Sequence, residues 1–249
     1  MIEARSRSFS EVVGGLSPYH PGAEVHGTTV LALRFKSGAL VLADRRATMG
    51  NLIMFEKAEK IEQLDPWTVV AISGAYARSL EICRYLKHSF KYSERLNQQE
   101  FSTEAKLMEI SRALSGNMAM AAEGGVFLPI AAAYDKKRKT FGVYFFDGAG
   151  ARFQDSDYAC AGSGSERIRG VFEYLIRTQG PWAQRSREDV LTEALRILDI
   201  AASLDSATGG FRKGLPLVTE LTSDGAVPLS EGEIRTAAAQ VLGEFQPLA

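Results

Sequence analysis

The chain has little of what disulfide frameworks and metal sites are built from. It contains two cysteines, Cys83 and Cys160, which lie far apart and form no CxxC pair. A disulfide framework and a cysteine-rich zinc site are therefore both poorly supported. Its three histidines are His20, His26 and His88, so no dispersed cluster is available for a metal or for a Ser-His-Asp arrangement. We expect a protein that works without a metal or an organic cofactor.

An excess of charge of one sign and long hydrophobic runs are missing as well. Lys and Arg number 29 and Asp and Glu number 30, which gives a net charge of −1. General nucleic-acid or membrane-surface binders need a large cationic excess, so neither function is expected. The longest apolar runs, such as 126–134, are far shorter than the ~20 residues of a membrane-spanning helix. Residues 1–15 lack the apolar segment of a secretory signal, and we expect a cytoplasmic protein.

What the chain does contain is enough apolar sequence for one large core. Apolar residues make up 45% and charged residues 24% of the 249 residues, which is ordinary for a globular protein. Residues 1–27 differ, because they mix Ser, Gly, Pro and charges without a helical or strand period, and they predict a flexible leader. Residues 28–249 show no linker, repeat or low-complexity tract, so we expect a single domain there.

The hydrophobic periodicity predicts strands and helices in a definite order. Thr28–Phe35 and Ala39–Asp44 flank the turn sequence KSG, which is typical of a β-hairpin. Apolar residues recur at helical spacing in Ala75–Phe90 and Ser102–Ala122. Further strands are expected at Lys60–Leu64, Thr68–Ser73, Val126–Tyr134, Thr140–Phe146, Phe153–Ala161 and near Leu215–Thr222, and further helices at Ser165–Arg177, Arg187–Ala202 and near Glu231–Gly243.

The order of these elements indicates the fold class. Strands and helices do not alternate one by one, so a Rossmann or doubly wound parallel sheet is not expected. Helices that arrive in consecutive pairs predict antiparallel helix hairpins packed on the faces of sheets. We therefore expect an α+β fold, a four-layer αββα sandwich in which two antiparallel sheets lie between helical layers.

The most specific feature of the sequence is HGTTV, followed by ADRRATMGN and an isolated KAEK. Thr28 and Thr29 stand at the junction between leader and core. Asp44 lies where the second strand of the predicted hairpin returns toward the start of the first, and Lys60 begins the next strand. An acid and an amine can therefore converge near Thr28, although the pattern leaves the hairpin register open.

Five motifs in this order resemble the proteasome β family, especially its bacterial branch. They are Gly-Thr-Thr, the DRRATMGN segment, Lys60, GSGS at Gly162–Ser165 and DSATGG at Asp205–Gly210. The resemblance extends from about Thr28 to about Thr222. One such motif is weak, since GSGS occurs in many loops, but five in order are specific. The resemblance implies the N-terminal nucleophile hydrolase fold and a threonine endopeptidase that is made as a precursor.

The nucleophile implied by this resemblance is the hydroxyl of Thr28. A threonine hydroxyl needs a base within hydrogen-bond reach, and a free N-terminal amine can serve. Such an amine has an ordinary pKa of about 7.7–8.0, near the pH at which a general base works best. Thr28 is internal, so removal of residues 1–27 as a propeptide, by cleavage of the Gly27–Thr28 bond, would have to create that amine. Gly27 suits the tight backbone geometry of self-attack.

The resemblance also assigns roles around the nucleophile. An ammonium group on Lys60 would lower the pKa of the new amine, and Asp44 would compensate the charge of a buried lysine. The backbone N–H of Gly74 corresponds to the oxyanion-hole donor and precedes a predicted helix, where free N–H groups favour an anion. The chain departs from the family at Ala43, where Gly is common, and at 53–58, which is more apolar than is typical.

Two further sets of residues follow from the resemblance alone. Ser163, Asp205 and Thr208 match positions that support the nucleophile through hydrogen bonds and proton handling, and the family often has Ser in place of Thr208. The residues that match the substrate-binding positions are Ala47, Thr48, Ala58, Ile72 and Tyr76. Small side chains with one aromatic indicate acceptance of apolar substrate side chains, but they do not give the pocket size.

Each motif also has a purely structural alternative. Residues 28–30 can be merely the start of a strand, because Thr and Val favour strands. The Asp-Arg-Arg sequence at 44–46 can be a solvated strand end with a local ion pair, and Lys60 can be a surface lysine. Residues 162–165 can form a turn and a helix N-cap, which is compatible with the functional interpretation.

The resemblance implies partners as well. It predicts stacked seven-membered rings, with β rings between rings of proteasome α subunits, an ATPase unfoldase ring, and unfolded polypeptides as substrates inside a closed chamber. The alternatives are the related two-ring ATP-dependent threonine peptidase, a non-catalytic β-type ring subunit and a self-cleaving amidohydrolase. DSATGG and the longer region 223–249 favour the proteasome β interpretation over the first. Retention of Thr28, Asp44, Lys60 and Gly74 argues against the second, and the sequence shows no evident charged substrate pocket for the third.

Overall fold

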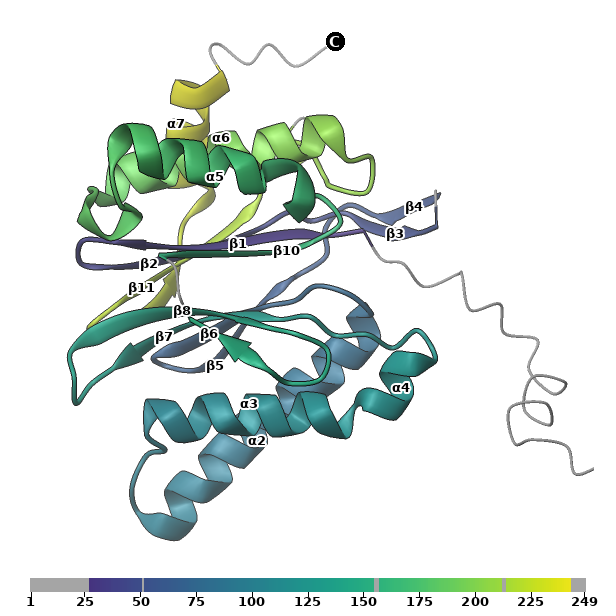
Figure 1. Ribbon diagram of the computed structural model, residues 1–249, viewed down its shortest axis with the longest axis vertical. Coiled ribbons are helices and arrows are strands. Elements are labelled where there is room, and N and C mark those ends of the chain that lie inside the picture. The colour runs from purple at the N-terminus through teal and green to yellow at the C-terminus, as the bar shows by residue number, and fades with distance from the viewer. Residues whose placement is uncertain (1–26, 51, 155–156, 212–213, 243–249) are drawn as a thin grey trace, which may run out of the picture.

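Two antiparallel sheets stacked face to face form the centre of the molecule. The computed structural model describes residues 27–50, 52–154, 157–211 and 214–242. In Figure 1 helices cover the outer face of each sheet, so the layers are helices, sheet, sheet and helices. Three clusters of buried side chains fill the spaces between these four layers. The predicted α+β sandwich is confirmed.

The first sheet contains the predicted N-terminal hairpin at its centre. Its strands, in spatial order, are β10 (Tyr158–Gly162), β1 (Thr29–Phe35), β2 (Gly38–Ala43), β11 (Leu217–Thr222) and β12 (Gly225–Pro228). Phe35 pairs with Gly38, which fixes the register that the sequence left open. The outer face of this sheet packs on α5 (Ser165–Gln179), η1 (Trp182–Gln184), α6 (Arg187–Leu204) and α7 (Glu231–Leu242).

The second sheet packs on the other pair of helices. Its strands are β5 (Ile61–Asp65), β6 (Thr68–Ala71), β7 (Ile130–Asp135), β8 (Thr140–Phe146) and β9 (Arg152–Phe153). Its outer face carries α2 (Tyr76–Asn97) and α3 (Thr103–Gly116), and α4 (Met118–Ala122) follows α3. Within the described residues every helix is too short or too polar to cross a bilayer.

Alternation along the strands explains why two different cores form. Successive side chains of a strand point to opposite faces. Leu31 and Leu33 of β1 therefore pack against the helices, whereas Val30 and Ala32 face the second sheet. The layer between the sheets consists mostly of Ala and Val, and such small side chains let the two sheets approach closely.

Several predicted boundaries were wrong. Helix α2 continues to Asn97 instead of ending at Phe90. The predicted helix Ser102–Ala122 is two helices, because buried Asn117 uses its side chain to donate to Gly125 O and to accept from Arg78 instead of continuing the helix. The predicted strand Val126–Tyr134 begins only at Ile130. The predicted strand Phe153–Ala161 is divided between the two sheets as β9 and β10.

Three strands were not predicted at all. The short β3 (Ala47–Met49) and β4 (Leu52–Phe55) form a separate hairpin, and β12 completes the edge of the first sheet. Every residue of β4 is exposed, so no alternation of apolar and polar residues marks it as a strand. The first half of the segment 53–58, which looked atypical in the sequence, thus belongs to this exposed strand.

Candidate active site

The junction between leader and core is buried at the start of β1. Thr28 is 3% exposed, and its hydroxyl donates to the carbonyl oxygen of Gly27 over 2.7 Å. The amide of Gly27 donates to Thr48 Oγ1 on β3 over 2.8 Å. A Cβ at Gly27 would overlap Ala207, so only glycine fits this close approach. The Thr28 hydroxyl therefore lies beside the peptide bond that the sequence predicts to be cut.

Asp44 holds several elements together next to this junction. It follows β2, is 1% exposed and accepts a hydrogen bond on Oδ1 from the Thr29 amide (2.8 Å). Its Oδ2 accepts from the amides of Arg46 (2.9 Å) and Gly209 (2.8 Å). A buried carboxylate is costly unless its charge is paired and its oxygens are hydrogen-bonded, and both conditions are met here. The alternative of a solvated strand end is wrong for Asp44.

Lys60 supplies the paired charge. It is 1% exposed, and its Nζ donates to Asp44 Oδ1 over 2.8 Å and also to the carbonyl oxygen of Arg46. Burial lowers the pKa of Lys60 below its ordinary value of 10.5, and the neighbouring Asp44 carboxylate opposes this shift. Lys60 therefore gives up its proton more easily than a surface lysine would. These contacts bring the predicted acid and amine together at the amide of Thr29, the residue after Thr28.

A chain of hydroxyl groups links the start of β1 to the loop after α6. Asp205 Oδ2 accepts from Ser163 Oγ and from Thr208 Oγ1, each over 2.6 Å. Thr208 Oγ1 lies 2.6 Å from Thr29 Oγ1. Because the single proton of Thr208 goes to Asp205, Thr29 is the donor in this last bond. The predicted supporting residues are thus brought together, and their chain of hydrogen bonds reaches Thr29, the residue after Thr28.

Two glycines make this approach possible. Gly162 on β10 has φ +97°, and a Cβ there would overlap the Thr28 carbonyl. A Cβ at Gly164 would overlap the Thr29 hydroxyl and lie 2.9 Å from Thr208 Oγ1. The GSGS motif therefore provides close backbone approach as well as the expected turn. Ser165 Oγ donates back to Gly162 O over 2.7 Å, which stabilises that turn before α5.

Gly74 borders a cavity next to the start of β1. It has φ +102°, a region that favours glycine, and a Cβ there would overlap Val126 O. The cavity has a volume of about 720 Å³, and Gly74 lines it together with Gly162 and Ser163. The candidate oxyanion donor and the start of the GSGS motif thus face the same space.

The five predicted substrate-binding residues lie on β3, in the segment before Lys60 and at the passage from β6 to α2. Thr48 is buried and binds Gly27, and Ala47 precedes it on β3. Ala58 donates its amide to Arg45 O over 2.9 Å, and Ile72 donates its amide to Lys60 O over 2.8 Å. Tyr76 OH donates to Glu59 O over 2.8 Å. Their shared role as a pocket for a substrate side chain remains a prediction.

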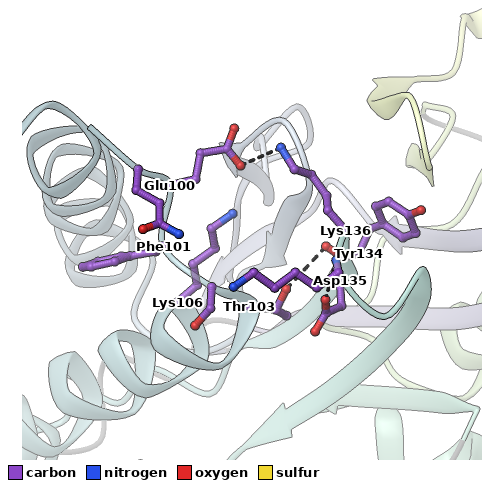
Figure 2. Close-up of a pocket in the computed structure, with 10 residues that line it drawn as sticks. Glu100, Phe101, Thr103, Lys106, Tyr134, Asp135 and Lys136 are labelled. Atoms are coloured by element: carbon purple, nitrogen blue, oxygen red, sulfur yellow. Dashed lines mark hydrogen bonds and ion pairs between the residues drawn. The ribbon is translucent and has the colours of Figure 1, made fainter. Parts of the chain in front are cut away.

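A separate hollow of about 310 Å³ lies at the far end of β7, beside the turn between α2 and α3. Figure 2 shows the side chains of Lys136 and Glu100 pointing toward one another, and they are bonded over 2.7 Å. Lys106 in its wall pairs with Asp65 over 2.7 Å. Each of these two lysines is thus paired with a carboxylate, whereas the groups around Thr28 gather at the start of β1 in the first sheet. The junction is therefore the better candidate for the chemistry.

Sequence reasoning missed three residues of the site. The Thr29 amide and hydroxyl both contact predicted site residues, and the Gly209 amide binds Asp44. The Arg46 guanidinium donates to the carbonyl oxygens of Ser206 (2.7 Å) and Thr208 (3.1 Å), tying the segment after β2 to the loop after α6. Arg46 and Gly209 stand inside the motifs DRRATMGN and DSATGG, which was the available signal.

Comparison with known proteins agrees with this geometry. The family model described as proteasome subunit matches residues 24–211. A proteasome subunit beta of Streptomyces griseus is 32% identical over 220 residues, which cover 87% of this chain and 76% of the relative. A proteasome subunit beta of Streptosporangium roseum is 31% identical over 252 residues, which cover 95% of this chain and 88% of the relative. From its motifs, its layers and these matches, the chain belongs to the proteasome subunit family.

Proposed function

We propose that this chain is the precursor of a threonine endopeptidase, the β subunit of a proteasome core particle. The observation that carries the proposal is the geometry of the junction. The Thr28 hydroxyl contacts the Gly27 carbonyl group, while the buried pair of Asp44 and Lys60 is bonded to the next amide. A strand that merely begins with threonine would need none of these groups.

Self-cleavage would proceed by attack of Thr28 Oγ on the carbonyl carbon of Gly27. The two atoms close a five-membered ring, so the reaction is intramolecular and gains from proximity. The hydroxyl proton passes to the departing nitrogen, the C–N bond breaks, and an ester joins Gly27 to Thr28 Oγ. Water then hydrolyses this ester, which leaves a Gly27 carboxylate and restores the hydroxyl beside a free Thr28 amine.

The mature enzyme would use the same hydroxyl on other polypeptides. The Thr28 amine takes the hydroxyl proton while Oγ attacks a substrate carbonyl carbon, and the proton then goes to the leaving amine. The amide of Gly74 would stabilise the oxyanion that develops in this step. Positive charge at Lys60 lowers the pKa of the Thr28 amine, and Asp44 holds Lys60 in place. Ser163, Asp205 and Thr208 act through Thr29 as positioning residues.

The proposal extends to assembly. Residues 1–27 are a propeptide that keeps the amine masked until the chain is enclosed. The domain 28–249 then joins other β subunits and α subunits in stacked heptameric rings, in the cytoplasm, and an ATPase ring delivers unfolded polypeptides. Proteasome subunits beta of actinobacteria support this assignment as relatives.

The test is the N-terminus of the chain after assembly with its α-type partner. Intact mass and N-terminal sequencing should find Thr28 as the first residue of the wild type. The Thr28→Ala variant lacks the nucleophile and should remain at full length, whereas Thr28→Ser keeps a hydroxyl and should still mature. Activity is then measured on a peptide with an amide bond after an apolar residue.

Each outcome has a clear meaning. A mature wild type, an uncut Thr28→Ala variant and peptide hydrolysis only by the mature form would support the proposal. An uncut wild type in a fully assembled particle would overturn it and favour a non-catalytic ring subunit. Cleavage of Thr28→Ala at the same bond would show that another protease removes the leader.

A further inference from the structure

The cavity beside Thr28 is larger and more apolar than an oxyanion hole requires. Its volume is about 720 Å³, within the range of sites that hold small ligands. Val126, Leu128, Phe145 and Ala161 supply hydrocarbon walls, and Glu166 and Arg169 stand in the lining with opposite charges. An apolar side chain would lose water on entering this space, and the balanced charges of Glu166 and Arg169 do not select one sign of charge.

The Gly27–Thr28 junction of the precursor shows on which side of Thr28 the acyl half of a bond is held. In the Gly27–Thr28 bond the leader is the acyl half, and the amide of Gly27 is held by Thr48 on β3. Strand β1 lies between β10 and β2, and β3 follows β2 along the chain. The acyl half of the bond is therefore held on the β2 side of Thr28.

The cavity lies on the opposite side. Its wall contains Cys160–Gly162 of β10 and Ser163 after it, and Gly162 pairs with Thr29 across the edge of β1. Gly74 and Ala75 form another part of the wall. A polypeptide substrate would have its acyl half near Thr48 and its scissile carbonyl beside Thr28 and Gly74. The residues after the scissile bond would then continue into this cavity.

We propose that this cavity binds the leaving-group half of the substrate and selects an apolar residue directly after the scissile bond. The inference rests on the proposed protease function and adds a second determinant of specificity to it. Leu128 is the residue best placed to tune this selection, because it is half-buried in the cavity wall and none of the proposed catalytic or positioning roles falls on it.

The experiment uses assembled particles and internally quenched peptides. All peptides share one acyl half and differ only in the residue after the bond, which is Leu, Phe, Ala or Asp. For the wild type, kcat/KM with Leu or Phe should exceed that with Asp by about tenfold or more, as a hydrophobic pocket discriminates. Leu128→Trp narrows the cavity and should reduce this ratio severalfold. Leu128→Ala enlarges the cavity and should shift the preference from Leu toward Phe.

Three controls separate this proposal from the protease proposal. Self-cleavage at Thr28 has the chain's own β1 as its leaving half and should be unchanged in both Leu128 variants. A peptidyl methyl ester with the same acyl half releases only methanol, so its hydrolysis should also be unchanged. Leu96→Trp makes a similar enlargement at an exposed position of α2 and should alter nothing.

The outcomes can be told apart. An uncut wild type that does not hydrolyse the ester would overturn the protease proposal, and the cavity proposal with it. A mature, ester-hydrolysing enzyme with equal kcat/KM for all four peptides would overturn the cavity proposal alone. The cavity proposal would also be overturned if the Leu128→Trp variant had the same preference among the four peptides as the wild type.

Discussion

Replacing Lys60 by methionine removes one half of a buried ion pair and leaves the other half in place. Asp44 would remain almost fully buried, with its carboxylate bonded only to the amides of Thr29, Arg46 and Gly209. Loss of one partner from a buried pair costs about 3–5 kcal/mol. Because three N–H groups still bond to the carboxylate, we expect the lower end, a loss of about 3 kcal/mol in the free energy of unfolding.

The variant should also fail to mature. Without the ammonium group, Asp44 loses the partner that holds it against the Thr29 amide, so the geometry of the Thr28 junction is no longer fixed. The free energy of unfolding is measured by urea titration of the isolated chain, followed by tryptophan fluorescence at neutral pH. Maturation is measured by intact mass after assembly, at a temperature where the variant is folded.

A matched control exists in the same chain. Lys106 on α3 is also buried and pairs with Asp65 over 2.7 Å, at the far end of the second sheet. Lys106→Met should lower the free energy of unfolding by a similar or smaller amount and should mature normally. A Lys60→Met chain that matures at the wild-type rate would refute the reasoning. If Lys60→Met and Lys106→Met failed to mature to the same extent, the effect of Lys60 on maturation would be explained by stability alone.

Three further predictions concern the same site. Gly74→Ala should lower the free energy of unfolding by about 1–3 kcal/mol, because φ at this position is +102° and a Cβ would overlap Val126 O. Near-normal peptide hydrolysis by this variant would contradict the assignment of Gly74 as the oxyanion donor. Thr208→Val leaves the Thr29 hydroxyl without its acceptor, so it should lower the free energy of unfolding by about 1–3 kcal/mol and shift the pH profile of ester hydrolysis. Thr208→Ser should restore both properties, and a Ser variant as impaired as the Val variant would show that packing is the cause. Burial lowers the pKa of Lys60, so the folded chain loses this proton at a lower pH than the unfolded chain. Between the lowered pKa and about pH 10.5, the free energy of unfolding of the wild type relative to Lys60→Met should therefore rise with pH. A fall over the same pH range would show that the effect of Asp44 outweighs that of burial.

Local sequence was enough to predict the fold class. The hairpin around KSG, the two pairs of helices and the order of strands all follow from periodicity, because each element buries one face against a neighbouring layer. The exposed hairpin β3–β4 shows the limit of this argument, since an element without a buried face leaves no periodic pattern. Asn117 shows another, because the helix ends there through side-chain bonds to Arg78 and Gly125, which lie outside the helix.

The motifs were enough to nominate Thr28, Asp44 and Lys60, but not to say which atoms meet. The sequence placed the supporting hydroxyl of Thr208 near the nucleophile, and the structure bonds it to Thr29. Arg46 was treated as part of a charged strand end, yet it ties two distant segments together through the carbonyl oxygens of Ser206 and Thr208.

The sequence by itself thus determined the layered fold and nominated the junction at Gly27–Thr28. Only the tertiary structure decided the four donors of Asp44, which come from positions 29, 46, 60 and 209. It also decided the cavity, whose walls come from both sheets, α5 and the loop before β7. The physical reason is the range of the interactions. Periodicity and turn chemistry act within a few residues, whereas these contacts depend on sheet order and on the stacking of two sheets, which neighbouring residues do not encode.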